Sequence, residues 1–325
     1  MKKLLFIFLF VIVPIDGYTK AVSEELIARQ EKVRAKWKYN PFRTSNRERL
    51  LFGWQNPNAF ITRFWIGGIP NLHSVFPNPN MKTHDIAMAF APLLATELNV
   101  IPFEVGQLKV RIGIGFLADL NFFVYKSHIK QLYGNTFLVS DFLNVSTFVD
   151  FVVDDTWKLR WLPLIHLCSH GGGDYFGDPS LGGTKEWADM GYESMGFEFY
   201  YNWNYFTFYS GIRFGMRGVF GSYYATLFSL FAGADVRVPV WGYLNFIVGF
   251  FVAGDYNTIN TLKREGNHVR RLASHKQWNP VFSSALGVEL DRLTLSFKYS
   301  QMQSRHLVAF WKRDIRYGFE ATVYF

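Results

Sequence analysis

The stretch that decides the fold is YGFEATVYF, residues 317–325, at the end of the chain. Apolar side chains alternate in it with small or polar ones. Tyr317, Phe319, Ala321, Val323 and Phe325 therefore share one face when the segment is extended, because successive side chains of a strand point to opposite faces. The chain thus ends in a predicted β-strand with one strongly apolar face.

The same alternation recurs along most of the chain, for example in QLKVRIGIGF (107–116), SMGFEFYYNW (194–203) and YLNFIVGFFV (243–252). A period of two predicts strands that are apolar on one side only. The pattern predicts twelve of them, at residues 59–68, 84–96, 107–121, 143–154, 158–171, 192–203, 205–217, 223–238, 242–255, 279–290, 293–302 and 316–325.

Composition indicates what covers the apolar faces. Aromatic residues make up 19% of the chain and charged residues only 18%, yet no stretch after the N-terminus is a run of about 18 apolar residues. A chain of this kind crosses a membrane with a closed sheet rather than with helices. The predicted fold is all-β, a transmembrane antiparallel up-and-down barrel of about twelve strands.

The N-terminal residues predict export. Residues 1–21 carry two lysines, a short apolar run and then small or polar residues, which is the layout of a secretory signal peptide. Residues 22–57 are charged and are expected to form a periplasmic arm or short helix, or a solvated tail, and residues 58–325 the barrel. The single cysteine excludes an internal disulfide.

The connections fit the same topology. The predicted links after the fourth, sixth, eighth and tenth strands are short, whereas most of the others are long. Outer-membrane barrels have short periplasmic turns and long extracellular loops. The terminal aromatic also resembles the C-terminal signature of Gram-negative outer-membrane proteins. That resemblance implies location in the outer membrane and recognition of Phe325 by the barrel insertion machinery.

The faces opposite the apolar ones carry charges of both signs, which we expect to pair across a plugged lumen rather than to line a wide pore. The predicted inward charges are Lys109, Arg111, Lys158, Arg160, Arg213, Arg237 and Lys298 against Asp150, Glu198, Asp235, Glu289 and Glu320. The predicted extracellular loop 256–278 is basic and suits lipopolysaccharide phosphates. Outer-membrane lipid and lipopolysaccharide are the expected partners, and nucleic acid is not.

The chemistry-bearing residues gather in HLCSHGGGD, residues 166–174, at the end of the predicted fifth strand. Simple alternation points Leu159, Trp161, Ile165 and Leu167 toward lipid. It points Lys158, Arg160, His166, Cys168 and His170 toward the lumen. On a strand His166 and His170 lie roughly 13 Å apart, too far to share one metal ion.

A histidine two residues from a nucleophile resembles the H-x-S dyad of outer-membrane phospholipase A and of one class of lipid A deacylase. Here the corresponding residues are His166 and Cys168, although the phospholipase dyad faces lipid and its asparagine has no evident counterpart. The cluster is also similar to an uncharacterised outer-membrane family with an H-x-S-S-H-x-G-D-E signature and a following S-R-E strand, which Glu193 matches.

The resemblance to the phospholipase implies a hydrolase with His166 or His170 as base and Cys168 or Ser169 as nucleophile. Asp174 would then orient the base or bind calcium, given further oxygen ligands. Three functions remain open: a barrel with a structural, solute-related or lipid-related role, an outer-leaflet lipid esterase, and a surface receptor or adhesin. In the first, the cluster only holds a loop.

Overall fold

A computed structural model of the chain describes residues 49–52, 60–68, 86–125, 136–153, 156–169, 190–219, 221–222, 224–241, 244–265, 268–302 and 314–325. Within these ranges the chain forms twelve β-strands. They are β1 (Ile61–Gly68), β2 (Ile86–Val105), β3 (Leu108–Tyr125), β4 (Thr136–Val153), β5 (Trp157–Ser169), β6 (Met190–Trp203), β7 (Phe206–Gly215), β8 (Tyr224–Trp241), β9 (Leu244–Glu265), β10 (His268–Leu290), β11 (Leu293–Met302) and β12 (Asp314–Tyr324).

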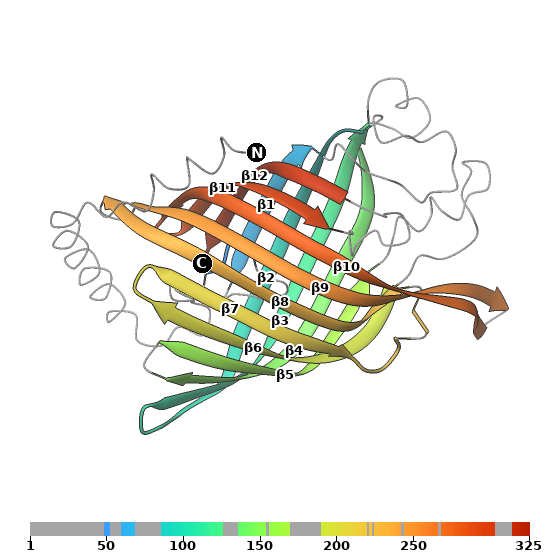
Figure 1. The fold of residues 1–325 in the computed structure, drawn as a ribbon, viewed down its shortest axis with the longest axis horizontal. Helices are drawn as coiled ribbons and strands as arrows, with labels where there is room; N and C mark the ends of the chain where they lie inside the picture. The colour runs from blue at the N-terminus through green and yellow to red at the C-terminus, as the bar shows by residue number, and fades with distance from the viewer. Residues whose placement is uncertain are drawn as a thin grey trace.

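The strands form one closed barrel (Figure 1). Each strand pairs antiparallel with its neighbours in sequence, and β1 pairs with β12 from Ile61↔Tyr324 to Gly68↔Tyr317. The predicted twelve-stranded antiparallel barrel is confirmed. Closure leaves no seam, so the backbone groups of the strands bond one another around the ring.

The outer surface of the barrel is apolar. Phe319 is 68% exposed, and Tyr317 and Phe325 lie on the same outward face, as their alternation predicts. Large apolar side chains are exposed in the same way on the other strands, among them Phe64, Leu94, Ile114, Phe197, Leu230 and Leu286. An apolar surface that surrounds a closed barrel is covered by lipid. None of the described residues forms a helix long and apolar enough to cross a membrane.

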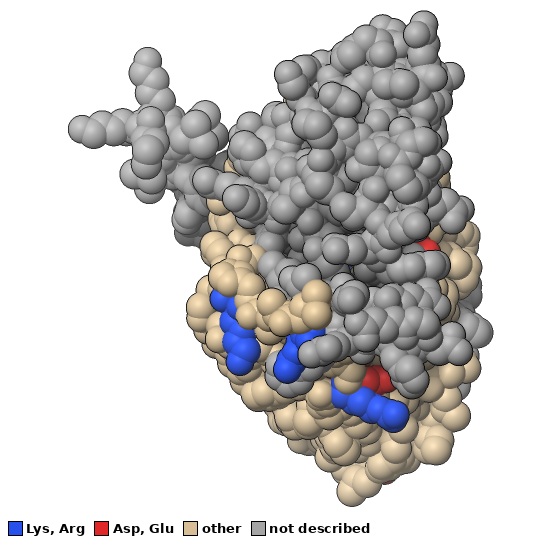
Figure 2. Space-filling model, turned by 90° about the vertical axis from the view of Figure 1, so that its right-hand side faces the viewer, with Lys and Arg blue, Asp and Glu red and all other residues tan. Residues whose placement is uncertain are grey.

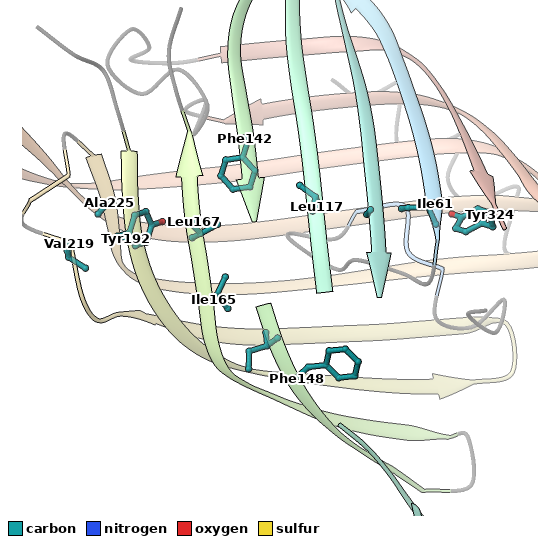
Figure 3. Close-up of a cluster of buried hydrophobic side chains, with 12 residues drawn as sticks. Ile61, Leu117, Phe142, Phe148, Ile165, Leu167, Tyr192, Val219, Ala225 and Tyr324 are labelled. Carbon is teal, nitrogen blue, oxygen red and sulfur yellow. The ribbon is translucent and has the colours of Figure 1, made fainter. Parts of the chain in front are cut away.

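Most of the predicted lumen charges are buried and paired, whereas Lys109, beside the turn between β2 and β3, is exposed. Arg160 bonds Asp150 through two nitrogens, at 2.6 and 2.8 Å, and lies 2.5 Å from Glu97 on β2. A second pair joins Arg213 and Glu198 at 2.5 Å. Part of the interior is instead apolar, because Leu117, Phe142, Leu167 and other side chains form one buried cluster (Figure 3).

A short part of the predicted N-terminal arm lies inside the barrel. Arg49, Leu50 and Leu51 are buried there against the strands, and Phe52 packs beside them. The rest of the predicted arm up to residue 48, residues 53–57 and the predicted signal peptide lie outside the described residues.

The predicted loop 256–278 is wrong. β9 continues to Glu265 and β10 begins at His268, and their pairing runs to His268↔Glu265. Figure 1 shows this hairpin extending beyond the barrel. Beyond the membrane both faces of a strand meet water, so the apolar alternation that identifies a membrane-spanning strand stops while the hydrogen-bonded ladder continues.

Candidate functional site

A β-bulge at Pro163 determines where the predicted site residues point. On the β6 side, Leu162 pairs with Gly196 and Ile165 pairs with Ser194, so two residues of β5 oppose one residue of β6. A matching shift occurs on the β4 side. Proline has no N–H to give to the ladder and is found in sheets at edges or bulges. The extra residue reverses the alternation of β5 beyond it.

The predicted orientation of the upper half of β5 is therefore wrong. Leu159 and Trp161 face outward as expected, and Lys158 and Arg160 face the lumen. Beyond the bulge, however, Ile165 and Leu167 lie in the interior apolar cluster, at 1% and 3% exposure. His166 and Cys168 consequently share the outward face. Neither residue faces the lumen.

His166 meets a carboxylate on the neighbouring strand. It lies directly opposite Glu193 of β6, and its Nδ1 is 3.4 Å from Oε1 of Glu193. Both side chains are reachable from outside, at 47% and 27% exposure. A carboxylate at Nδ1 fixes the ring and leaves Nε2 available to accept a proton. The family resemblance points to Glu193, but its contact with His166 depends on the register between two strands and does not follow from the sequence pattern.

Cys168 stands two residues from His166 on the same strand and face, with their Cα atoms roughly 6.6 Å apart. It is partly exposed and is a free thiol. On β4, Leu143 lies opposite Cys168, and Val145 lies opposite His166 with half of its surface exposed. A thiol, an imidazole and a carboxylate thus adjoin an apolar surface that faces the membrane.

The connection after β7 holds Glu193 in place. The N–H of Glu193 donates to the carbonyl of Arg217 at 2.8 Å, and the N–H of Met216 donates to the carbonyl of Glu193 at 2.7 Å. The chain then turns at Gly218, whose φ of +77° favours glycine. A methyl group there would lie 3.5 Å from Oε2 of Glu193, so this turn borders the carboxylate.

A row of aromatic side chains crosses the outer face of the barrel toward the site. Trp278 of β10 lies 5.2 Å from Tyr256 of β9 and 6.3 Å from Phe228 of β8, between ring centroids, and Phe228 lies 5.4 Å from Phe214 of β7. Phe214 pairs in turn with Met195, two residues from Glu193 on β6. The row therefore leads across the outer face to the strand that carries Glu193.

The remaining predicted site residues are not brought together by the described structure. Ser169 ends β5, but its side chain is outside the description, and His170 and Asp174 lie outside the described residues altogether. In the described part of the chain, no three or more His, Cys, Asp or Glu side chains are grouped to hold a metal ion. The predicted calcium site, with Asp174 as a ligand, lies outside the described residues and stays a prediction.

No family model and no curated protein sequence matches the chain. Solved structures match its fold. The outer membrane phospholipase A of Escherichia coli superposes with a TM-score of 0.50 at 9% identity, over 87% of this chain and 95% of that one. The outer membrane phospholipase of Salmonella typhi, solved as a dimer with bound calcium, gives a TM-score of 0.50 at 10% identity with the same coverage. These likenesses agree with the closed, outwardly apolar barrel: the chain is an outer-membrane β-barrel protein.

Proposed function

We propose that the protein hydrolyses acyl esters of outer-leaflet lipids, with Cys168 as nucleophile, His166 as base and Glu193 as the residue that orients His166. The observation that carries this proposal is the outward orientation of the three residues. A lumen-facing cluster would have no access to membrane lipid. The bulge at Pro163 instead presents the cluster to the bilayer beside the aromatic row.

The reaction follows from the chemistry of the three groups. Nε2 of His166 takes the proton of the Cys168 thiol, and the thiolate attacks the ester carbonyl. The alkoxide of the lipid leaves with the proton from His166, and a thioester remains on Cys168. Water, deprotonated by His166, then releases the fatty acid and restores the thiol. Glu193 stabilises the imidazolium that forms in each half-reaction.

The surroundings suit an acyl chain. Val145 and Leu164 lie on the same outer face as His166 and are exposed, so a lipid chain has apolar contacts on both sides of the histidine. Ester groups of membrane lipids lie between the hydrocarbon and the head groups, and His166 lies near the end of β5, toward that boundary. The substrate therefore does not have to leave the membrane.

The test is fatty-acid release by the purified barrel from phospholipid and, separately, from lipid A in mixed micelles. We expect Cys168→Ala and His166→Ala to abolish release, whereas Ser169→Ala leaves it unchanged. Mass spectrometry of the intact protein should show an acyl adduct that hydroxylamine removes and that Cys168→Ala lacks.

Two outcomes would contradict the proposal. One is the absence of release from both lipids by a barrel that is folded by its heat-dependent mobility on gels. The other is release that survives Cys168→Ala. Release of fatty acid from one lipid but not from the other identifies the substrate.

We also propose a second role, binding of lipopolysaccharide phosphates, for the β9–β10 ribbon, residues 260–265 and 268–281. β8 stops pairing with β9 at Ile259, and β11 starts pairing with β10 at Phe282. In the described residues the ribbon strands pair only with each other. Residues 256–278 hold five Lys or Arg and one Glu, a formal net charge of +4.

The basic residues of this ribbon suit anions rather than another strand. Charged side chains on an edge strand discourage pairing with further strands, and clustered basic groups bind phosphate. Arg271, His275 and Lys276 are exposed. Figure 2, which faces this end of the molecule, shows more basic than acidic surface among the described residues.

The test is lipopolysaccharide binding by the triple variant Arg270→Gln, Arg271→Gln and Lys276→Gln, with Arg292→Gln at the opposite end as control. We expect weaker binding for the triple variant and a shallower dependence on salt. Equal binding and equal salt dependence for the two variants would contradict this role.

A further inference from the structure

The segment Arg49–Phe52 occupies the lumen against the half of the wall formed by β6 to β12. Leu50 and Leu51 are almost fully buried. Leu50 lies in one apolar cluster with Tyr200, Tyr209, Phe231, Phe251 and Val281. Leu51 lies in a second with Ile247 and Ala285, and Phe52 packs against both clusters. The segment is thus held by apolar contacts from several strands.

Charged wall residues also bind the segment, mainly through its backbone. The N–H of Leu51 donates to Oδ2 of Asp235 at 2.8 Å, and Nζ of Lys298 donates to the carbonyl of Leu51 at 2.5 Å. Arg237 donates to the carbonyl of Arg49. The Arg49 guanidinium, in turn, donates to the carbonyl of Asp291 in the turn between β10 and β11, at 2.5 Å.

Each of these wall residues has another partner in the wall. Lys298 lies 2.5 Å from Glu320, and Arg237 lies 3.3 Å from Glu289. Asp235 lies 3.7 Å from Arg237. If the segment leaves, no wall charge is stranded without a counter-charge, and water replaces the backbone groups. The wall that binds the segment therefore keeps its charges paired when the segment is absent. A segment that never leaves the lumen would not need this arrangement.

The number of strands determines how much interior space the segment could close. Side chains fill an eight-stranded barrel, whereas barrels of about sixteen strands hold open aqueous channels. A twelve-stranded barrel lies between these limits, and here a piece of the chain takes up interior space. We infer that the lumen is a passage for small hydrophilic solutes that the chain's own segment Arg49–Phe52 closes. This inference is independent of the hydrolase proposed above.

The first test replaces Leu50 and Leu51 with serine, which removes the apolar contacts but keeps the length and backbone of the segment. Ion conductance is measured in planar bilayers with the full-length mature barrel. We expect a several-fold higher conductance than in the wild type. Leu286→Ser, on the lipid face far from the proposed site, is the matched control and should conduct as the wild type does.

The second test locks the segment in place. A Cβ built on Gly249 would lie 3.1 Å from Cβ of Leu51 and 2.6 Å from Oδ1 of Asp235. A shift of the Asp235 side chain and a small separation of the two stretches of chain give the roughly 3.8 Å between Cβ atoms that a disulfide needs. Leu51→Cys with Gly249→Cys, in a Cys168→Ser background, should therefore form a disulfide on oxidation. We expect the oxidised barrel to conduct less than the same protein after reduction.

The two tests together decide the inference. It is overturned if the serine variant folds and conducts no better than the wild type. It is also overturned if the oxidised and reduced disulfide variant conduct equally. If the serine variant does not assemble, the disulfide variant alone decides, because its two states are compared in one folded protein.

Discussion

Arg160 holds together a buried cluster of charges in the lumen, and its removal should strongly destabilise the barrel. The guanidinium is 1% exposed and bonds Asp150 twice and Glu97 once, with all three contacts between 2.5 and 2.8 Å. Arg160→Ala leaves two buried carboxylates without this partner. Breaking a buried ion pair costs about 3–5 kcal/mol, because an uncompensated charge remains.

The assay is urea unfolding of the barrel reconstituted in lipid vesicles. With a slope of about 2 kcal/mol per molar urea, a loss of that size lowers the midpoint by about 2 M. Arg292→Ala is the matched control: its Nε lies 4.0 Å from Asp291, and both side chains are more than half exposed. Exposed pairs of this kind contribute about 0–1 kcal/mol.

A further variant separates lost charge pairing from lost packing. Arg160→Met combined with Asp150→Asn and Glu97→Gln removes the arginine and both carboxylates, and should recover most of the lost stability. The reasoning is refuted if Arg160→Ala lowers the midpoint no more than Arg292→Ala does. It is refuted as well if the neutral triple variant is no more stable than Arg160→Ala.

Three other outcomes are expected. Glu193→Gln should lower the turnover of lipid ester by roughly 10²-fold or more, without loss of barrel stability, because His166 keeps its place but loses the charge that stabilises its protonated form; an unchanged kcat would remove Glu193 from the site. Deletion of Pro163 should remove the bulge and leave Cys168 facing lipid, so a lipid-soluble maleimide should still label Cys168. Loss of labelling would show that Cys168 faces lipid only when the bulge is present. Phe325→Ala should reduce the fraction of protein that assembles in cells, measured by heat-dependent gel mobility, while the purified variant refolds in detergent; normal assembly would argue against recognition of Phe325 by the insertion machinery.

Much of the barrel can be predicted from the sequence, because a strand between lipid and lumen must alternate in polarity. The last strand, which precedes Phe325, and the inward charges around Arg160 follow from that rule. It does not apply to residues 271–276 of the ribbon, where side chains on both faces are exposed to water. The sequence pattern therefore ends before the strands do.

His166 and Cys168 of the candidate site can be picked out from the sequence, but the face of the strand on which they lie cannot. His166 and Cys168 are spaced as a strand-borne dyad, and that spacing is local. Simple alternation treats the strand as regular through Pro163. The one extra residue there reverses the face that alternation predicts for His166 and Cys168. The partner Glu193 lies 27 residues further along the chain, and only the register between β5 and β6 brings it to His166.

The bulge also shows how a barrel strand can change in length. One residue inserted into a strand is taken up by a bulge, so the residues beyond it keep their lumen or membrane faces. A strand of this kind can therefore gain a residue without bringing its charged interior side chains into contact with lipid.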